Sequence, residues 1–402
     1  MKSVRGRVGK SLTKFNLSVN KNILVRGLLA TIILLLVIIY LRRVCNFDAV
    51  TEMFTSYKRC EKIPIKGLYR QILDEEGVNL EQDLDKFDLY YPCGYNKIEK
   101  ELRSITLKDY QNVFGICGCD TIASKSSLWK TLESYYGRDK ARQYMPESYI
   151  LRNDEQLNNF KRIFDPSRVY ILKKNIQRKK GIKISNNLNE IIKARNDKFV
   201  LVQEKVDSLI INKRRMNLRI YLVVKCREGY KELYMHDNAK CLYTSKDVDQ
   251  EKANSGTPEE FESLITNSYV TELTIYNTNP LTLNHLCEYI EKNYNVPREQ
   301  LMASIEENLK VVFKALLTKL CNCDNIHKNG QFQLFGADVI LDTNLKPYIL
   351  EINKGPDMKH KDEADRLLKK KVIFDTFNLM NVVKAKNNDY KKFIYRTTHI
   401  YL

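Results

Sequence analysis

The sequence predicts an α+β fold in which antiparallel sheets are flanked by helices, preceded by one transmembrane helix. Residues 331–342 and 346–357 are apolar or alternating over strand lengths, with turn-forming residues between them. After Pro297, apolar residues recur at the spacing of one helix face. Near the N-terminus, residues 23–41 are almost wholly apolar. These observations indicate strands, helices and a membrane span in one chain.

The composition indicates a globular chain with an anionic partner. With 402 residues, the chain is long enough for two or three packed domains. Its 67 lysines and arginines outnumber 49 acidic residues and give a formal net charge of +18. Nucleic acid, an anionic membrane, nucleotide phosphates and acidic polypeptides would all match this charge, unless much of it is solubilising surface. Because no RNA-recognition or zinc-finger pattern is present, nucleic acid is not expected.

The 10 cysteines form no CxxC motif and have no histidines at zinc-site spacing, which argues against a structural zinc. They are too sparse for a disulfide scaffold, so we expect mostly buried thiols. Their even number leaves disulfides open for a domain that faces an oxidising compartment.

A basic tail and an apolar run begin the chain. Residues 1–22 carry six lysines and arginines and no acidic residue. At about 1.5 Å per residue, residues 23–41 approach the ~30 Å of a bilayer's hydrocarbon core, so we expect a single membrane anchor rather than a buried helix or a cleaved signal. Only Arg42 and Arg43 follow the run closely. The positive-inside rule therefore places the N-terminus in the cytosol and the large domain on the far side of the membrane, a type II arrangement.

Short strands and helices alternate through the middle of the chain. Residues 44–110 give few sharp signals. Helical patterns cover residues 125–136 and 154–164, and the helix after Pro297 presents Leu301, Ile305, Leu309, Val312 and Leu316 on one face. Apolar and β-branched runs predict strands at 145–151, 169–173, 199–206 and 218–226. A lysine-rich helical tail is expected beyond Lys359.

Three oxygen-bearing side chains converge on the predicted hairpin. If residues 331–342 and 346–357 pair as antiparallel strands, Asp338 lies almost opposite Glu351, and Asn353 shares the face of Glu351. Hard oxygen ligands of this kind suit Mg²⁺ that bridges the phosphates of a nucleotide. The alternative is a solvated Asp338 and a Glu351 that pairs with one of many lysines.

A basic loop follows the strand predicted at 169–173. Residues 173–184 gather cations around Gly181, among them Lys173 and Lys180. Such a loop can fold over polyphosphate, because ammonium groups neutralise its charge and glycine permits a close backbone approach. It lacks the GxxxxGK[ST] pattern of a P-loop, and a solvated basic loop is the alternative.

Polar residues within two other strands are further candidates. Gln203 and Glu204 lie at the end of the strand at 199–206, where edge groups can bind an adenine amino group. Arg219 lies inside an apolar strand and needs a carboxylate or a phosphate as its partner. The alternatives are a simple loop entry for the first pair and a structural ion pair for Arg219.

In chain order, these segments resemble the tubulin–tyrosine ligase-like family of ATP-grasp ligases over residues 114–376. The strongest likeness lies in Phe332-Gln-Leu-Phe-Gly-Ala-Asp338 and Leu350-Glu-Ile-Asn-Lys-Gly-Pro356, which are similar to the family's FxLFGxD and EINxxP elements. This likeness implies that Asp338, Glu351 and Asn353 hold Mg²⁺.

The resemblance also implies roles for residues outside the hairpin. Tyr170-Ile-Leu-Lys173 is similar to the strand whose lysine contacts the nucleotide phosphates. Residues 214–219 are similar to the RKxDxR element, in which Arg219 reaches the substrate and the transferred phosphate. Lys173 and Arg219 are thereby expected to be catalytic. The nucleotide-binding set that the resemblance implies is Lys173, Lys180, Gly181, Gln203, Glu204, Val206, Arg215, Asn217, Asp338 and Asn353.

The sequence departs from the family pattern at several positions. Glu204 replaces the hinge lysine, and Asn217 replaces the aspartate of RKxDxR. Tyr243 stands where the family usually has an arginine, and Ile275 where it has an asparagine. These changes leave ATP and Mg²⁺ binding as expectations but weaken any inference about the substrate.

The resemblance implies a two-lobed ATP-grasp fold that holds the nucleotide between α+β lobes. The chain would then divide into a basic N-terminal tail (1–22), a transmembrane helix (23–41), an N-terminal region of the ligase (44–165), a catalytic core (166–376) and a C-terminal tail (377–402).

The activity implied is ATP- and Mg²⁺-dependent ligation of glutamate, glycine or tyrosine to an acidic protein acceptor such as a tubulin tail, through an acyl phosphate. The basic net charge fits an acidic acceptor. The predicted anchor raises the alternative of a membrane-tethered enzyme with a non-tubulin acceptor. The altered Tyr243 and Ile275 raise that of a nucleotide-binding module with low activity.

Overall fold

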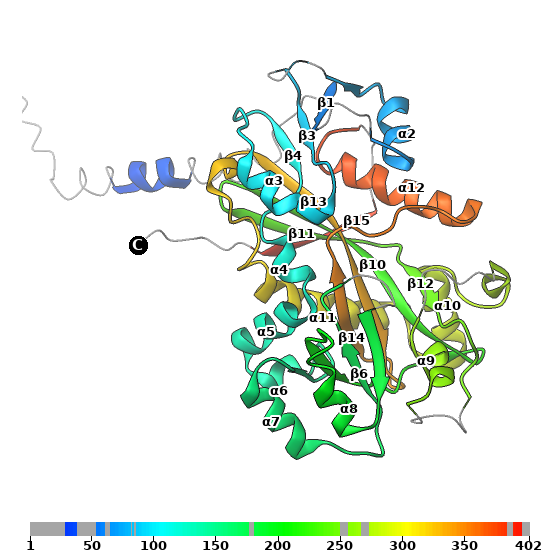
Figure 1. Ribbon diagram of the computed structural model, residues 1–402. Coiled ribbons are helices and arrows are strands. Elements are labelled where there is room, and N and C mark those ends of the chain that lie inside the picture. The colour runs from blue at the N-terminus through cyan, green and yellow to red at the C-terminus, as the bar shows by residue number, and fades with distance from the viewer. Residues whose placement is uncertain are drawn as a thin grey trace, which may run out of the picture. The chain divides into compact units, whose positions relative to one another are not determined.

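Two β-sheets form the frame of residues 53–402 in the computed structural model (Figure 1). The structure describes residues 29–37, 54–60, 65–81, 83, 86–176, 181–249, 256–266, 273–383 and 389–395. Residues 1–52 make a separate unit.

The N-terminal unit does not support the predicted transmembrane helix. Of this unit the structure describes residues 29–37, which are helical, and the rest of the predicted span at 23–41 lies outside the described residues. Across the described ranges, no helix combines the length and the apolarity needed to cross a bilayer. The predicted anchor at 23–41 and the type II membrane placement built on it are therefore wrong. The basic tail at 1–22 lies outside the described residues.

An eleven-stranded mixed sheet holds most of the fold. Its central strands, β10 (Arg214–Arg227) and β13 (Gly330–Leu341), pair antiparallel from Leu218 opposite Val339 to Cys226 opposite Gln331. Antiparallel strands beside them are β9 (Ile210–Ile211), β11 (Tyr230–His236), β12 (Lys240–Tyr243), β14 (Pro347–Asn353) and β15 (Tyr390–Tyr395). The parallel part beyond β13 consists of β4 (Asn112–Phe114), β3 (Leu89–Tyr91), β1 (Ser56–Arg59) and β2 (Asn79–Leu80).

A four-stranded antiparallel sheet forms a second lobe. Its strands, in spatial order, are β5 (Ser148–Ile150), β8 (Leu201–Glu204), β6 (Tyr170–Lys173) and β7 (Ile182–Ser185). Two helices, α7 (Asp154–Ile163) and α8 (Leu188–Lys193), bury Leu157, Phe160 and Ile191 in a small core with residues of this sheet. Because β5 comes from the predicted N-terminal region and β8 from the predicted core, this lobe draws on both.

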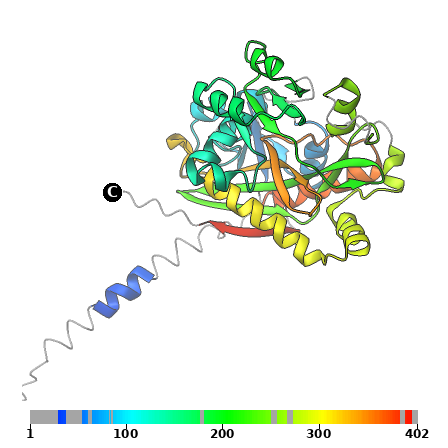
Figure 2. The ribbon, with the colours of Figure 1, turned by 90° about the horizontal axis from the view of Figure 1, so that it is seen from below.

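Helices cover both faces of the large sheet, because side chains alternate along its central strand. On β10, Leu218, Ile220 and Leu222 belong to one buried core, whereas Tyr221 and Val223 belong to another. The first core includes residues of α5 (Lys125–Tyr136), α10 (Leu283–Tyr294) and α11 (Arg298–Leu316), and the second residues of α2 (Leu68–Glu75) and α12 (Glu363–Asn378) (Figures 1 and 2). The shorter helices are α3 (Ile98–Ser104), α4 (Cys119–Ala123), α6 (Arg138–Ala141), α9 (Pro258–Leu264), η1 (Tyr95–Lys97), η3 (Leu273–Asn277) and η4 (Asp324–Ile326).

Local signals set the limits of several helices. The Ser124 side chain caps α5 by accepting a hydrogen bond from the Ser127 N–H, and Gly137, at φ 79°, follows its last residue. Asp362 caps α12 in the same way, through the N–H of Asp365. These ends follow from sequence alone, which is why α5 begins and ends where the periodicity predicts.

The α+β class and the elements predicted between residues 125 and 353 are confirmed, with shifted ends. The predicted strand at 218–226 extends to the whole of β10, and the predicted helix after Pro297 is α11. The hairpin of β13 and β14 places Asp338 directly opposite Glu351, where the sequence predicts them to be almost opposite, and a register shift between Asp338 and Val339 completes the alignment.

Three disulfides correct the expectation of mostly buried thiols. They join Cys60 to Cys93, Cys117 to Cys323, and Cys226 to Cys321. Among the described cysteines, Cys119, Cys241 and Cys287 remain as free, buried thiols. The sequence could not pair these cysteines, because their partners lie 33, 206 and 95 residues away.

The central sheet gives a stability prediction. Phe335 lies in the middle of β13 with 0% of its surface exposed, so Phe335→Ala leaves a cavity and should lower the free energy of unfolding by about 3–5 kcal/mol. Tyr110, 54% exposed, is the control, and Tyr110→Ala should cost under about 0.5 kcal/mol. Urea unfolding followed by circular dichroism measures both. Equal losses would show that β13 is not part of the core.

Candidate active site

A cavity of 640 Å³ lies between the two sheets. Its walls come from β6, β7, β8, β10, β12, β13 and β14, together with the start of α5, the end of α9 and the segment 355–359 that follows β14. Most of the residues singled out by the sequence line this one space, although they come from positions as far apart as Lys173 and Asn353.

The three predicted metal ligands meet on the hairpin of β13 and β14. Asp338 pairs with Glu351 across the strands, and Asn353 faces Gly336. The Asn353 Nδ2 donates a hydrogen bond of 3.3 Å to Glu351 Oε1, and all three predicted ligands line the cavity. The hairpin therefore presents two carboxylates and an amide oxygen to one volume.

Arg219 neutralises Asp338. The guanidinium holds both carboxylate oxygens, with an Nη2–Oδ2 distance of 3.0 Å and a second hydrogen bond from Nε to Oδ1. Burial raises the pKa of Asp338, and the charge of Arg219 opposes that rise. Gly336 makes room for this pair, because a Cβ there would lie 2.8 Å from Arg219 Cδ. The glycine of the FGAD segment is thus a steric requirement that the sequence analysis did not identify.

Lys125 is a site residue that the sequence analysis missed. Its ammonium lies 3.1 Å from Glu351 Oε2, and its side chain is 7% exposed. Burial alone would raise the pKa of Glu351, but the charges of Lys125 and Lys173 outweigh it and lower that pKa to about 2. A signal existed in the sequence: Lys125 is the first residue of a helix, where the macrodipole disfavours a cation that has no anionic partner.

Lys173 reaches the cavity from the small sheet. Its ammonium donates hydrogen bonds to Gln203 Oε1 at 2.6 Å and to the Leu350 carbonyl at 3.5 Å. Burial lowers the pKa of Lys173 to about 8. The fully buried side chain of Gln203 is thus committed to Lys173, and the predicted adenine contact is left to Glu204 and Val206, which line the cavity.

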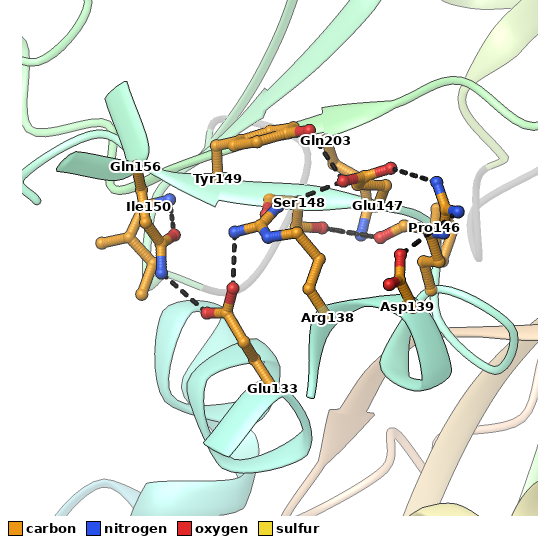
Figure 3. A network of polar contacts seen from close by, with 11 residues as sticks. Glu133, Arg138, Asp139, Pro146, Glu147, Ser148, Tyr149, Ile150, Gln156 and Gln203 are labelled. Atoms are coloured by element: carbon orange, nitrogen blue, oxygen red, sulfur yellow. Dashed lines mark hydrogen bonds and ion pairs between the residues drawn. The ribbon is translucent and has the colours of Figure 1, made fainter. Parts of the chain in front are cut away.

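A network of hydrogen bonds and ion pairs fixes the side chain of Gln203 (Figure 3). Its Nε2 donates to Ser148 Oγ at 2.9 Å, and the Ser148 carbonyl accepts from Arg138 at 3.2 Å. The Arg138 guanidinium also pairs with Glu147 at 3.2 Å and lies 4.4 Å from the centre of the Tyr149 ring. Through β5, these contacts fix the position of the acceptor oxygen that receives the Lys173 hydrogen bond.

The remaining predicted residues divide into three groups. Asn217 lines the cavity, donates to Thr266 Oγ1 at 2.8 Å, and keeps a buried amide oxygen that accepts no hydrogen bond from the described residues. Arg215 and Gly181 do not line the cavity. A Cβ at Gly181 would lie 2.5 Å from Ile176 Cγ1, so the glycine gives the loop room for the Ile176 side chain. Lys180 lies outside the described residues.

Tyr243, which stands where the family usually has an arginine, does not line the cavity. Tyr243 is fully buried, and its hydroxyl donates to the Pro280 carbonyl at 2.9 Å, away from the cavity. Leu242, opposite Asn217 in the ladder of β10 and β12, lines the cavity instead. An apolar side chain therefore occupies this wall at the end of β12.

Comparison with known proteins places this geometry in a family. The profile of the Tubulin-tyrosine ligase family matches residues 103–390, a range that includes every residue lining the cavity. The chain belongs to the Tubulin-tyrosine ligase family. Membership supports the expectation of an amino-acid ligase.

Several proteins similar to this Tubulin-tyrosine ligase family member carry polyglutamylase names. The Probable tubulin polyglutamylase TTLL2 of Mus musculus is 23% identical over 81% of this chain and 61% of its own length. The Tubulin polyglutamylase ttll-4 of Caenorhabditis elegans is 26% identical over 73% of this chain and 50% of its own length. The Probable beta-tubulin polyglutamylase of Tetrahymena thermophila is 22% identical over 77% of this chain and 27% of its own length. The chain thus spans less than two thirds of these relatives.

Lys125 gives the first prediction from the site. Lys125→Met removes a buried cation from the cavity and should weaken Mg-ATP binding about tenfold or more, because a hydrogen bond to a charged group contributes about 1.5–3 kcal/mol. The control is Lys130→Met on the exposed face of the same helix. Isothermal titration calorimetry measures both affinities. An unchanged affinity in Lys125→Met would remove Lys125 from the nucleotide site.

Glu351 gives a prediction about acid stability. Because its pKa falls from the ordinary ~4.3 to about 2 on folding, its ionised form stabilises the protein above pH ~4.3, and this stability is lost as the pH falls towards about 2. Glu351→Gln lacks this dependence. The stability difference between wild type and Glu351→Gln, from urea unfolding between pH 6 and pH 3, should therefore narrow as the pH falls. A constant difference would contradict the lowered pKa.

Proposed function

We propose that this chain is an ATP- and Mg²⁺-dependent ligase that joins an amino acid to a carboxylate of an acidic polypeptide such as a tubulin tail. One observation carries the proposal: the oxygen donors Asp338, Glu351 and Asn353 line a single cavity between two sheets together with the cations of Lys125, Lys173 and Arg219. Family membership and the polyglutamylase names of similar proteins support the reaction class and the acceptor. The formal charge of +18 suits an acidic acceptor.

The donor set fits a divalent cation beside phosphates. Asp338, Glu351 and Asn353 offer the hard oxygen atoms that Mg²⁺ prefers. When bound, Mg²⁺ would offset charge on the phosphates during transfer. The carboxylates would then ligate the ion, and Lys125 and Arg219, which now neutralise them, would be left to bind phosphate oxygens.

The nucleotide would lie between the lobes, as in an ATP-grasp fold. Ile171, Val206 and Leu350 give the cavity an apolar section suited to an adenine ring, next to the end of β8. Asn217 lines the same cavity, and its amide oxygen, which accepts no hydrogen bond from the described residues, would accept one from a ribose hydroxyl. Lys173 and Arg219 would then flank the phosphates from opposite sheets.

The reaction needs no nucleophilic side chain. An acceptor carboxylate oxygen attacks the γ-phosphorus of ATP, ADP leaves, and an acyl phosphate forms. The amine of the incoming amino acid then attacks the acyl carbon, inorganic phosphate leaves, and the amine loses a proton as the amide forms. Arg219 and Lys173 would stabilise the charge that builds on the transferred group.

Leu242 supports a second candidate, a nucleotide-binding module with low turnover. Leu242 gives the cavity an apolar wall, and the adjacent Tyr243, which stands where the family usually has an arginine, brings no cation to it. In that case Mg-ATP would still bind, because the ligand hairpin and Lys173 are intact, but the acceptor reaction would be slow. Turnover separates the two candidates.

The full chain should incorporate labelled glutamate, glycine or tyrosine into an acidic peptide only when ATP and Mg²⁺ are present, with equal release of ADP and phosphate. Asp338→Asn should lower kcat/KM by roughly 10²-fold, because it removes a ligand from the charge-stabilising cluster. Asp139→Asn, on the exposed surface of α6, is the matched control. ATP consumption that no acceptor or amino acid changes would reject the ligase in favour of the binding module.

A further inference from the structure

A second cavity adjoins the loop that follows the predicted metal ligands. It has a volume of 770 Å³ and is formed by residues 93–97, Lys100, Glu101, Ser104 and Gly355, and we call it the α3 hollow. Gly355 also lines the 640 Å³ cavity between the two sheets, which we call the nucleotide cavity. The two cavities therefore share a wall two residues beyond Asn353.

At the shared wall, Gly355 packs directly against Tyr95, and the neighbouring Lys354 is held by polar contacts. A Cβ at Gly355 would lie 2.3 to 2.6 Å from the ring of Tyr95, so only glycine lets the loop approach this closely. The neighbouring Lys354 carbonyl accepts a hydrogen bond of 2.5 Å from Gln333 Nε2, and the Lys354 ammonium pairs with Asp120. A polypeptide that crosses Gly355 would pass from one cavity to the other over a single fixed residue.

Two exposed lysines line the α3 hollow. Lys97 and Lys100, both exposed, are three residues apart at the start of α3, so their side chains lie on one face. Neither takes part in an ion pair among the described residues. The Glu101 carboxylate, which also lines the hollow, is held by hydrogen bonds from the Tyr90 hydroxyl at 2.8 Å and the Cys93 N–H at 3.2 Å instead of pairing with either lysine, so the lining carries two cations and one anion.

We propose that the α3 hollow binds a carboxylate side chain of the acidic acceptor, next to the residue that is ligated. This inference rests on the proposed function. The ligated carboxylate must reach the phosphate end of the nucleotide cavity, near Glu351 and Asn353, while the rest of the acceptor stays outside. The chain of the acceptor then crosses Gly355, and Lys97 and Lys100 meet its neighbouring acidic residue. The α3 hollow thereby selects acceptors with carboxylates close together in sequence.

The test measures binding of a fluorescein-labelled oligoglutamate peptide to the full chain by fluorescence anisotropy, with Mg²⁺ and a non-hydrolysable ATP analogue present. The charge reversal Lys97→Glu with Lys100→Glu should weaken peptide binding at least about tenfold and leave the affinity for the ATP analogue unchanged. The control is Lys193→Glu with Lys198→Glu, which changes the net charge equally at exposed residues that line neither cavity. Circular dichroism checks that both variants are folded.

The outcomes separate this proposal from the proposed function. Equal weakening by both double variants, or no weakening by either, would overturn the α3 hollow while amino-acid ligation by the wild type could still stand. Equally strong competition by a single-stranded oligonucleotide of the same charge would also overturn it, because the surface would then recognise charge alone. Peptide binding that depends on Lys97 and Lys100 in a chain without ligase turnover would support the α3 hollow and reject the ligase.

Discussion

The ion pair between Arg219 and Asp338 is the interaction on which the site depends. Both groups are largely buried, and an unpaired charge in such a place would cost several kcal/mol. The pair forms only if β10, β13 and β14 keep their register, because a shift of one residue would turn Asp338 to the opposite face. Correct pairing of the central strands and assembly of the ligand cluster are therefore the same event.

The cations around this cluster come from separate parts of the fold. Lys125 arrives on the first turn of α5, Lys173 on the small sheet, and Arg219 on the central strand. The charge of Glu351 is thus balanced by a covering helix and the other lobe, whereas that of Asp338 is balanced by the neighbouring strand of its own sheet. This arrangement suits a site where phosphates and a divalent ion replace internal ion pairs, since the protein charges already match the ligand charges.

The departures from the family pattern are concentrated away from the ligand hairpin. Leu242 presents an apolar surface to the cavity, and Tyr243 is turned into the core, where its hydroxyl binds a carbonyl. The residues that would hold Mg²⁺ and phosphates keep the family's types, whereas the wall beyond them does not. The choice of substrate is therefore where this chain is expected to differ from the polyglutamylases that it resembles.

The sequence by itself determined the α+β class, the hairpin of β13 and β14, the limits of α5, and the meeting of Asp338, Glu351 and Asn353. Each of these follows from periodicity, capping or strand register over short distances along the chain. The same local reasoning failed at residues 23–41, where an apolar run was taken for a membrane span. Only the tertiary structure decided that Lys125 neutralises Glu351, that Gln203 holds Lys173, and which cysteines pair. These contacts join residues far apart in sequence, and they depend on how sheets and helices pack, which no local pattern encodes.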